Sequence, residues 1–530
     1  MRRAIEVLAV LTFTGIGVAR IVSTYYVFSQ TVDEPNHVAS GMEWLDRGVY
    51  TVNPEQPPLG NVAVAFLPFL NGTRYPAAGG DWVQVGNQIL GYRDQYLRNL
   101  ALARLGVLPF FALATAIVWV WSRRVFGTMT ALVSILLFTT LPPILAHGGI
   151  ATTDMPLTGT FMVSMLTFIY FRPTYQHSCL LGLTVALAVI SKFSALAFVP
   201  PCGLGILACW WMMRQRKESE VSWGRIAGLA ALASAIVFIV IWGAYRFSRQ
   251  GWIPAPEFFT GINFLRLHNA RGHTSYLLGE IRQRGWWYFF PVALFVKTPV
   301  PFLILSGIGC AVLCNPKGKD WRAFATAAIA ATLLLVCMTS NINIGIRHIL
   351  PIYPPLAIVA GYGAVRLWSL SGVFRVGVIA LLLWQVVGGA RIHPDYLAYF
   401  NEFASTHADR VLVVSDLDWG QDLLRLADHL RAQKVTSIAL AVHGTGDPGR
   451  VHMPTFSNLP PCQPATGWIA ASEMALKIGR NAPPYGGWEW LEDYEPRAMV
   501  GKSIRLYYIP DGTHVRIPDV CNGKAEKAKR

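Results

Sequence analysis

Charged residues are scarce in this sequence. Only 14% of its 530 residues are Asp, Glu, Lys or Arg, whereas 53% are hydrophobic, with 18 Trp and 27 Phe among them. Soluble domains carry about 25% charged residues, so the composition excludes a chain of soluble domains. It indicates a polytopic membrane protein.

Several motifs of soluble and intramembrane chemistry are also missing. The sequence contains no HExxH, GxSxG or CxxC motif and no zinc-ligand spacing, which argues against an intramembrane hydrolase and a structural zinc site. No basic cluster alternates with aromatic residues, which argues against nucleic-acid binding. We attribute the net charge of +15 to contacts with anionic lipid headgroups and to the orientation of the chain in the membrane. No repeat is found, which counts against a transporter; a polyprenyl-lipid or glycan flippase is kept as the alternative.

Long apolar runs dominate instead. A run of about 18 or more apolar residues is long enough to cross a bilayer core of about 30 Å. The stretch 178–213 is ambiguous, because it fits two short helices bent at Ser191-Lys192 or one span with a re-entrant piece. We place about eleven spans, near 5–28, 101–122, 126–146, 153–171, 178–191, 193–213, 226–247, 288–314, 323–339, 351–368 and 373–391.

The loops between the runs predict the orientation. With Met1-Arg2-Arg3 in the cytoplasm, the inside loops each contain Lys or Arg, among them MRQRKESEVSWGR and NPKGKDWR, as the positive-inside rule requires. The outside then receives the loop 29–100, the stretch 248–287 and everything after 391. We expect the first run to be a retained anchor, and the protein to be a multi-pass protein of the cell (inner or plasma) membrane.

Residues 392–530 are predicted to form an extracytoplasmic α/β domain after the membrane domain 1–391. A strand over 411–415, a helix over 421–432 and a strand over 437–442 give a βαβ-like unit. Cys462 and Cys521 are the only cysteines here, and an oxidising location permits a disulfide between them. In DLDWGQDL (416–423) we expect Asp418 to cap the following helix; acceptor binding by this motif is the alternative.

The first acidic cluster follows directly on the first apolar run. TVDEPNHVASGMEWLDRG (31–48) places Asp33, Glu34 and His37 just beyond it, at the depth of a lipid headgroup. The loop continues with NPEQPPLG, which contains Glu55, and with AVAFLPFL, which we expect to be an interfacial helix. A loop of about seventy residues is too long to be a simple connector.

Taken in order, these motifs resemble a known family. The acidic motif after the first run, the Glu-x-Pro-Pro-Leu element at Glu55 and the outer Asp154 are accompanied by GHTSYLLGE (272–280), WWYFFPVALFVKTPVP (286–301) and GIRHILPIYPPLA (345–357). This order resembles the GT-C glycosyltransferases, above all the bacterial branch of the dolichyl-phosphate-mannose protein mannosyltransferase and aminoarabinose transferase group. Many relatives carry His before the Pro-Pro where this chain has Gln56, so a role of that His is not carried over.

The resemblance implies a GT-C fold, a polyprenyl-phosphate sugar as donor, transfer on the outer face of the membrane, and an Asp of the first loop as base. The expected partners are membrane lipids, the lipid-linked donor, and a glycan, lipid or protein acceptor that presents a hydroxyl or a phosphate.

The chemistry of such a donor supports the assignment. Hydrolysis of an ordinary glycoside needs a general acid and hence two carboxyl groups. A polyprenyl phosphate leaves as a phosphate monoester, whose second pKa is about 6, so it needs cations rather than a proton. One carboxylate must still take the acceptor's proton, a role that contributes about 10²- to 10⁴-fold. We expect Asp33 to be this base, with inversion, and Glu34 to orient it or the acceptor.

Asp154, in GGIATTDMP, lies at the outer end of the fourth run. Acidic residues at a membrane boundary are costly to bury and tend to be functional, although this one also fits a helix N-cap. The family has its second acidic residue in the corresponding loop, where a divalent cation or the acceptor is held. Asp33 and Asp154 are therefore the candidate ligands of a divalent cation, and Asp154 is a candidate catalytic residue.

Positive groups are needed for the phosphate. An ammonium in hydrocarbon costs at least about 2.5 kcal/mol, so Lys297 should have an anionic partner. A guanidinium binds phosphate in a bidentate fork, which favours Arg347, while a structural ion pair is the alternative for Arg104. The predicted substrate-binding residues are His37, Glu55, Arg104, Lys192, Arg271, His273, Tyr276, Lys297, Arg347 and His348.

Overall fold

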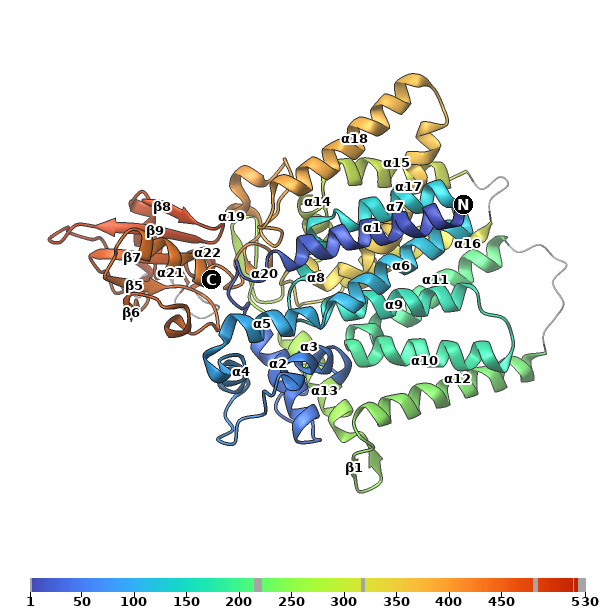
Figure 1. The fold of residues 1–530 in the computed structure, drawn as a ribbon, viewed down its shortest axis with the longest axis horizontal. Helices are drawn as coiled ribbons and strands as arrows, with labels where there is room; N and C mark the ends of the chain where they lie inside the picture. The colour runs from blue at the N-terminus through green and yellow to red at the C-terminus, as the bar shows by residue number, and fades with distance from the viewer. Residues whose placement is uncertain (1, 214–221, 316–319, 480–484, 518, 523–530) are drawn as a thin grey trace.

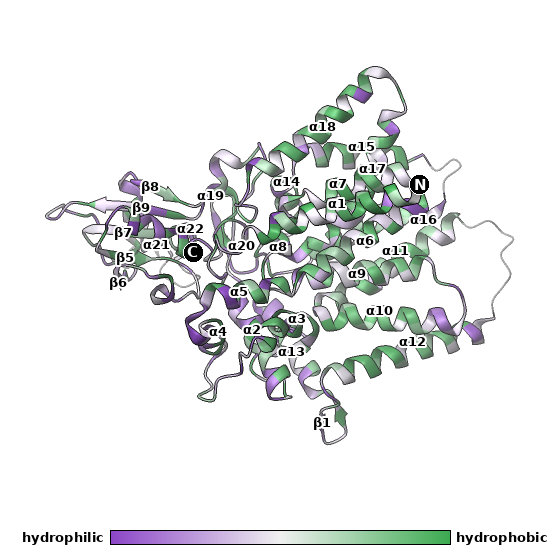
Figure 2. Ribbon diagram, in the orientation of Figure 1, coloured by the Kyte–Doolittle hydropathy of each residue, from purple (hydrophilic) through white to green (hydrophobic). Residues whose placement is uncertain are grey.

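The computed structural model describes residues 2–213, 222–315, 320–479, 485–517 and 519–522. Most of the predicted inside loop MRQRKESEVSWGR, the centre of NPKGKDWR and the tail from 523 lie outside these residues. The long helices run side by side along the horizontal axis of Figure 1, with the N-terminus at one end and a small sheet beyond the other. Figure 2 shows these helices as predominantly hydrophobic, whereas the sheet region is mixed.

The membrane part contains a helix in every predicted apolar run. Within the described residues six helices are long and apolar enough to cross a membrane, and two bent pairs raise the number to eight. Three shorter apolar helices, Asp154–Ile169, Tyr175–Ser191 and Trp321–Cys337, coincide with the remaining runs. The polytopic helical architecture is confirmed, and the count of eleven crossings stays a prediction.

The helices of the membrane part pack closely enough to exclude side chains at their crossings. A Cβ on Gly309 would lie 2.1 Å from the carbonyl oxygen of Val359, so the two helices that carry these residues touch through their backbones, as small residues allow in membranes. The bounds are α1 (Arg2–Val22), α6 (Leu108–Phe126), α7 (Thr128–Thr139), α8 (Pro142–Gly148), α9 (Asp154–Ile169), α10 (Tyr175–Ser191), α11 (Ser194–Met213), α12 (Trp223–Ala244), α14 (Phe289–Lys297), α15 (Val300–Leu313), α16 (Trp321–Cys337), α17 (Tyr353–Trp368) and α18 (Gly372–Arg391).

Shorter elements cover the end of the helices that faces the sheet. The predicted interfacial stretch is helical (α3) and packs on α2, since a Cβ on Gly41 would lie 1.8 Å from the carbonyl oxygen of Asn61. Glu43 of α2 fixes the connecting loop by accepting bonds from the backbone N–H of Thr51 (2.6 Å) and Val52 (2.9 Å). The bounds are α2 (Glu34–Asp46), α3 (Pro58–Leu70), α4 (Trp82–Leu90), η1 (Tyr92–Asp94), α5 (Tyr96–Leu105), β1 (Arg249–Gln250), β2 (Ile253–Pro254), α13 (Pro256–Arg271), β3 (Ser275–Leu277), β4 (Glu280–Arg282) and η2 (Ile346–Ile352).

The C-terminal region contains a five-stranded sheet of order β6-β5-β7-β9-β8. β5 pairs in parallel with β6 and β7, whereas β9 is antiparallel to β7 and β8. Cys462 and Cys521 form a disulfide. The bounds are η3 (Ser405–His407), α19 (Ala408–Val411), α20 (Val414–Leu417), α21 (Leu423–Ala432), β5 (Ser437–Ala441), η4 (Pro448–Val451), β6 (Thr455–Asn458), β7 (Gly467–Ser472), α22 (Glu473–Ile478), η6 (Glu489–Asp493), β8 (Ala498–Val500), β9 (Ile504–Ile509) and η7 (Asp519–Asn522).

Two expectations for this region are wrong. The stretch 411–415 is not a strand, because α19 and α20 occupy it and its polar groups bind the membrane part: the Ser415 hydroxyl donates to the Ile344 carbonyl, and Asp416 accepts from the Ile346 N–H (3.0 Å). Asp418 does not cap the helix that follows it. Its carboxylate accepts from the Met474 N–H (2.8 Å) in the first turn of α22, so it joins this segment to the sheet domain.

Candidate active site

Asp33 and Arg347 form an ion pair at the end of the helices that faces the sheet domain. Asp33 precedes α2 and Arg347 lies in η2, 314 positions later, yet Asp33 Oδ2 is 2.6 Å from Arg347 Nη1. The Asp33 side chain is 29% exposed and that of Arg347 only 9%. Burial alone would raise the pKa of the Asp33 carboxyl, but the charges of Arg347 and His37 outweigh it and hold that pKa below its ordinary value. Asp33 is therefore an ionised, partly open carboxylate at neutral pH.

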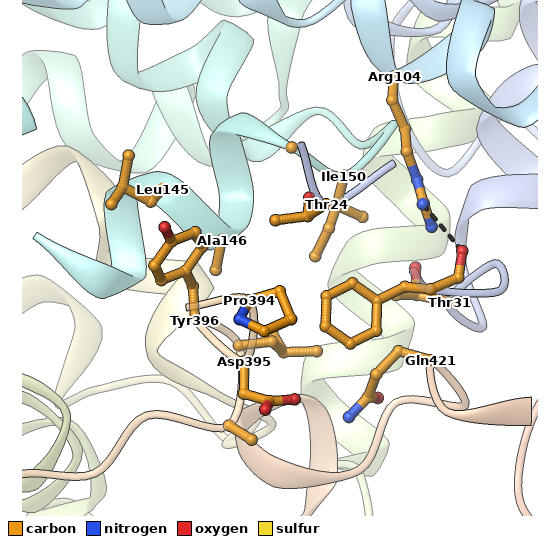
Figure 3. A pocket seen from close by; sticks show the side chains of 14 residues that line it. Thr24, Thr31, Arg104, Leu145, Ala146, Ile150, Pro394, Asp395, Tyr396 and Gln421 are labelled. Atoms are coloured by element: carbon orange, nitrogen blue, oxygen red, sulfur yellow. Dashed lines mark hydrogen bonds between the residues drawn. The ribbon is translucent and has the colours of Figure 1, made fainter. Parts of the chain in front are cut away.

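Glu34, the neighbour of Asp33, is committed to a closed pair with Arg104. The pair is bidentate, with Arg104 Nε 2.8 Å from Oε1 and Nη2 2.9 Å from Oε2, and both side chains are buried. The remaining N–H groups of Arg104 donate to the carbonyls of Tyr25, Phe28 and Ser29. Figure 3 shows Arg104 extended toward the loop that carries Thr31, at the wall of a narrow cavity. Neither Asp33 nor Arg347 lines that cavity.

Asp154 lies in the first turn of α9, and Lys192 lies in the break between α10 and α11. Asp154 Oδ1 is 2.5 Å from Lys192 Nζ, and its other oxygen accepts from the Thr152 hydroxyl at 3.1 Å. Both side chains are buried. The break at Lys192, which agrees with the two-helix interpretation of 178–213, directs the ammonium group at Asp154.

Unpartnered polar atoms surround Arg347. Within the described residues, its Nε, the Nδ1 of His147 and the Nε2 of His348 are buried and make no hydrogen bond. Trp419 covers the guanidinium at 4.2 Å from its ring centroid, and its ring lies 6.3 Å from that of His147. Buried polar atoms without partners are costly in a protein, and an Arg Nε can only donate. The cluster therefore fits an anionic ligand.

The sequence interpretation missed His147, Asp416 and Trp419. His147 ends the short helix α8, which a bend of 65° separates from α7, and no motif marks it. Asp416 and Trp419 belong to DLDWG, which was expected to be part of the C-terminal domain alone. The acidic DLDWG motif is conspicuous in the sequence, but no local pattern indicates that it lies beside Arg347.

His37 and Glu55 flank Asp33. The imidazole Nδ1 of His37 is 2.8 Å from Asn61 Oδ1, and burial lowers the pKa of His37 against the raising effect of Asp33. Burial, and then the charge of Asp33, raises the pKa of Glu55 to about 7. The charge of Asp33 thus acts on both His37 and Glu55.

Lys297 is buried and bound to main-chain oxygens. Its Nζ donates to the carbonyls of Leu397 (2.8 Å) and Asp416 (2.6 Å), and it stands 4.2 Å from the Phe400 ring centroid. The expected anionic partner is not in direct contact: among the described residues Lys297 forms no ion pair, and the Asp416 side chain acts on it through its charge. These contacts tie α14 to the segment after α18.

Of the three remaining predicted residues, only His273 is acted on by the charges of Arg347 and Asp33. Arg271 is exposed at the end of α13. His273 Nδ1 is 3.2 Å from His268 Nε2, and burial together with the charge of His268 lowers the pKa of His273 to about 4. Tyr276 is buried against Val413, Met474 and Ile478, at the contact with the sheet domain.

The acidic residues present do not fit the expected divalent cation. Asp33 and Asp154 are each paired with a basic side chain of the protein. In the ranges that the structure describes, no group of three or more His, Cys, Asp or Glu side chains is arranged to hold a metal ion. The positive charge at the site comes from Arg347 and Lys192.

The cluster lies in a polytopic bundle of apolar helices, at the end that faces the sheet domain. A family model described as dolichyl-phosphate-mannose-protein mannosyltransferase matches residues 12–250, which confirms the resemblance predicted from the sequence. The structure is similar to ArnT from Cupriavidus metallidurans bound to undecaprenyl phosphate, with a TM-score of 0.52 and 14% identity over 94% of this chain and 97% of that chain. The apo state of ArnT gives 0.51 at the same identity and coverage. No curated protein sequence matches this chain significantly.

Proposed function

We propose that the protein transfers a sugar from a polyprenyl-phosphate carrier to an acceptor hydroxyl or phosphate on the non-cytoplasmic side of the membrane, with Asp33 as general base and inversion at the anomeric carbon. The observation that carries this proposal is the double role available to Arg347. Its Nη1 binds Asp33, whereas its Nε is buried and has no partner in the part of the chain that the structure describes. One guanidinium can thus bind the base and the leaving phosphate at the same time.

The charges support a direct displacement. The acceptor hydroxyl attacks the anomeric carbon and passes its proton to Asp33, while the bond between that carbon and the phosphate oxygen breaks and its electrons remain on the phosphate. As Asp33 becomes neutral, Arg347 loses one negative neighbour, and the phosphate supplies another. The positive charge therefore needs no rearrangement during the step, which is the condition for electrostatic stabilisation of a transition state.

The assigned roles follow the contacts. Arg347 and Lys192, which both act electrostatically on Asp154, supply positive charge for the phosphate, and His147 and His348 offer ring nitrogens to its oxygens. Glu34 and Arg104 fix the loop that carries Asp33. The ArnT structure named above holds undecaprenyl phosphate, and we assign a carrier of the same class to this protein. The family match does not favour the flippase alternative.

The test is turnover in lipid nanodiscs with undecaprenyl-phosphate sugars as donors. We expect acceptor-dependent release of undecaprenyl phosphate, and we expect Asp33→Asn to lower the rate about 10²- to 10⁴-fold, the usual contribution of a general base. Asp46→Asn is the matched control, because Asp46 lies in the same loop but among the described residues binds only Arg74 and the Tyr75 N–H. Equal turnover by Asp33→Asn and wild type would refute the base. Movement of intact donor across the bilayer without release would favour the flippase.

A further inference from the structure

A chain of hydrogen bonds joins the Gln56 carbonyl, Tyr50, Asn61 and His37. Donors and acceptors can be assigned along it in only one way. The Tyr50 hydroxyl is 2.6 Å from the carbonyl oxygen of Gln56, Asn61 Nδ2 is 2.5 Å from the Tyr50 hydroxyl, and Asn61 Oδ1 is 2.8 Å from His37 Nδ1. A carbonyl can only accept, so Tyr50 must donate to Gln56. Tyr50 then accepts from Asn61, and this places the amide nitrogen of Asn61 at Tyr50 and its oxygen at His37.

The direction of this chain determines the tautomer of His37. The oxygen of Asn61 needs a donor, so the ring proton of His37 is on Nδ1, and Nε2 carries a lone pair. Nε2 makes no hydrogen bond within the described residues, and the charges that act on the ring are Asp33, Asp154 and Arg347, all of the active site. His37 thus presents an acceptor beside a carboxylate that is also an acceptor.

We propose that Nε2 of His37 is a hydroxyl-reading position: it accepts a hydrogen bond from a sugar hydroxyl at the active site and repels phosphate oxygens there. A phosphate oxygen carries only lone pairs, so it is unfavourable opposite Nε2. Two neighbouring acceptors, Asp33 and His37, suit two neighbouring hydroxyl groups, as a sugar ring offers. The hydroxyl belongs either to the donor sugar or to an acceptor glycan. This inference rests on the proposed transferase function and adds a specificity-determining residue to it.

The structure supplies a matched pair of variants. Tyr50→Phe removes the hydroxyl that orients Asn61, so the amide can turn over and His37 can shift its proton to Nε2. Tyr245→Phe is the control: its ring lies 5.7 Å from that of Tyr50, and its buried hydroxyl has no partner in the described part of the chain. Each variant removes one buried phenol oxygen from the same aromatic pair, and only one of these oxygens holds the chain.

The first measurement is independent of turnover. ¹⁵N spectra of histidine-labelled protein, with His37→Gln used to assign the resonance, should show His37 protonated at Nδ1 in wild type and Tyr245→Phe. They should show a shift toward the other tautomer in Tyr50→Phe. A wild-type ring protonated at Nε2 overturns the proposal.

The second measurement is transfer from undecaprenyl-phosphate sugars. We expect Tyr50→Phe to lower kcat/KM about tenfold, the effect of one hydrogen bond, with Tyr245→Phe unchanged. His37→Gln, whose amide oxygen can still accept, should retain more activity than His37→Leu. Loss of donor hydrolysis in parallel assigns the hydroxyl to the donor sugar, whereas loss of transfer alone, with a raised acceptor KM, assigns it to the acceptor.

Binding of undecaprenyl phosphate alone separates this inference from the function itself. We expect the same affinity in wild type, Tyr50→Phe and His37→Leu, because the phosphate does not meet Nε2. Weaker binding in His37→Leu, or wild-type transfer by all His37 and Tyr50 variants, overturns the hydroxyl-reading role while leaving the transferase intact. A wild-type protein that releases no undecaprenyl phosphate would instead contradict the proposed function.

Discussion

At the scale of the residue, neighbouring carboxylates in 31–48 serve different ends. Glu34 and Glu43 are buried and fully bonded, Glu34 to Arg104 and Glu43 to the loop at Thr51. Removing one partner from a buried ion pair costs about 3–5 kcal/mol, so Glu34 and Arg104 maintain the position of the loop. Asp33, by contrast, is partly exposed, and within the described residues the Arg347 guanidinium that it binds has a buried Nε without a partner. Access, and not charge, distinguishes the candidate base from its neighbour.

Glu55 gives a pH-dependent stability. Burial and Asp33 raise its pKa from 4.5 to about 7 in the folded protein, so between these values the folded state binds a proton that the unfolded state has lost. The free energy of unfolding therefore falls as pH rises through this window, and the loss is complete above about pH 7. Glu55→Gln removes this dependence. Thermal unfolding in detergent should show the variant gaining on wild type between pH 5 and pH 8.

The comparison for Glu55 is the exposed Glu280, whose one ion pair within the described ranges is with Arg282 at the surface. Glu280→Gln should shift the melting temperature equally at all pH values in that range. A pH-independent difference between Glu55→Gln and wild type would contradict the raised pKa of Glu55.

At the scale of the element, the segment from α20 to Trp419 connects the two parts of the chain. Asp416 receives the Ile346 N–H, Lys297 binds the Asp416 carbonyl, and the Val32 N–H donates to the Trp419 carbonyl at 3.0 Å. Asp418 meanwhile binds the start of α22. The backbone on both sides of the Asp33–Arg347 pair is thus fixed by one short segment.

This segment also shows what local sequence can and cannot predict. The helix predicted over 421–432 and the strand predicted over 437–442 are confirmed as α21 and β5, since a buried face is a local property. The apolar letters of 411–415 predicted a strand, but Ser415 and Asp416 satisfy hydrogen bonds of a turn about seventy residues earlier. Partners at such sequence distances leave no periodic signal, so the contact of Trp419 with Arg347 could not be predicted either.

Trp419 should influence activity through Arg347. The guanidinium lies 4.2 Å from its ring centroid, and a desolvated cation–π contact contributes about 2 kcal/mol, a factor of about 30. We expect Trp419→Leu to lower kcat/KM by about this factor and Trp419→Phe, which retains an aromatic face, by less. Melting temperatures of the two variants control for lost volume. Equal rates for the leucine and phenylalanine variants would show that Trp419 acts by packing alone.

At the scale of the whole molecule, distant segments assemble the site at one end of the helices. Asp33 follows α1, Asp154 starts α9, Lys192 separates α10 from α11, and Arg347 precedes α17. The sequence analysis predicted each of these residues as a catalytic or substrate-binding residue, from its residue type, its place beside an apolar run and the resemblance of the motifs. Their pairing, Asp33 with Arg347 and Asp154 with Lys192, depends on how the helices pack, which a single sequence does not encode locally.

The arrangement in Figure 1 makes the orientation in the membrane testable with introduced thiols. The first-loop helices and the sheet domain lie at one end of the helix bundle, and α12 begins at the other end. Ala78, Ser457 and Ser222 are all exposed, and the first two belong to the end that contains Asp33. Ser222 belongs to the basic loop MRQRKESEVSWGR, which the positive-inside rule places in the cytoplasm. The rule therefore places the end that contains Asp33 outside, where the proposed transfer takes place. A membrane-impermeant maleimide added to intact cells should therefore label Ala78→Cys and Ser457→Cys, and label Ser222→Cys only after lysis. The same three positions labelled in the opposite order would place Asp33 in the cytoplasm, where the proposed transfer could not serve an external acceptor.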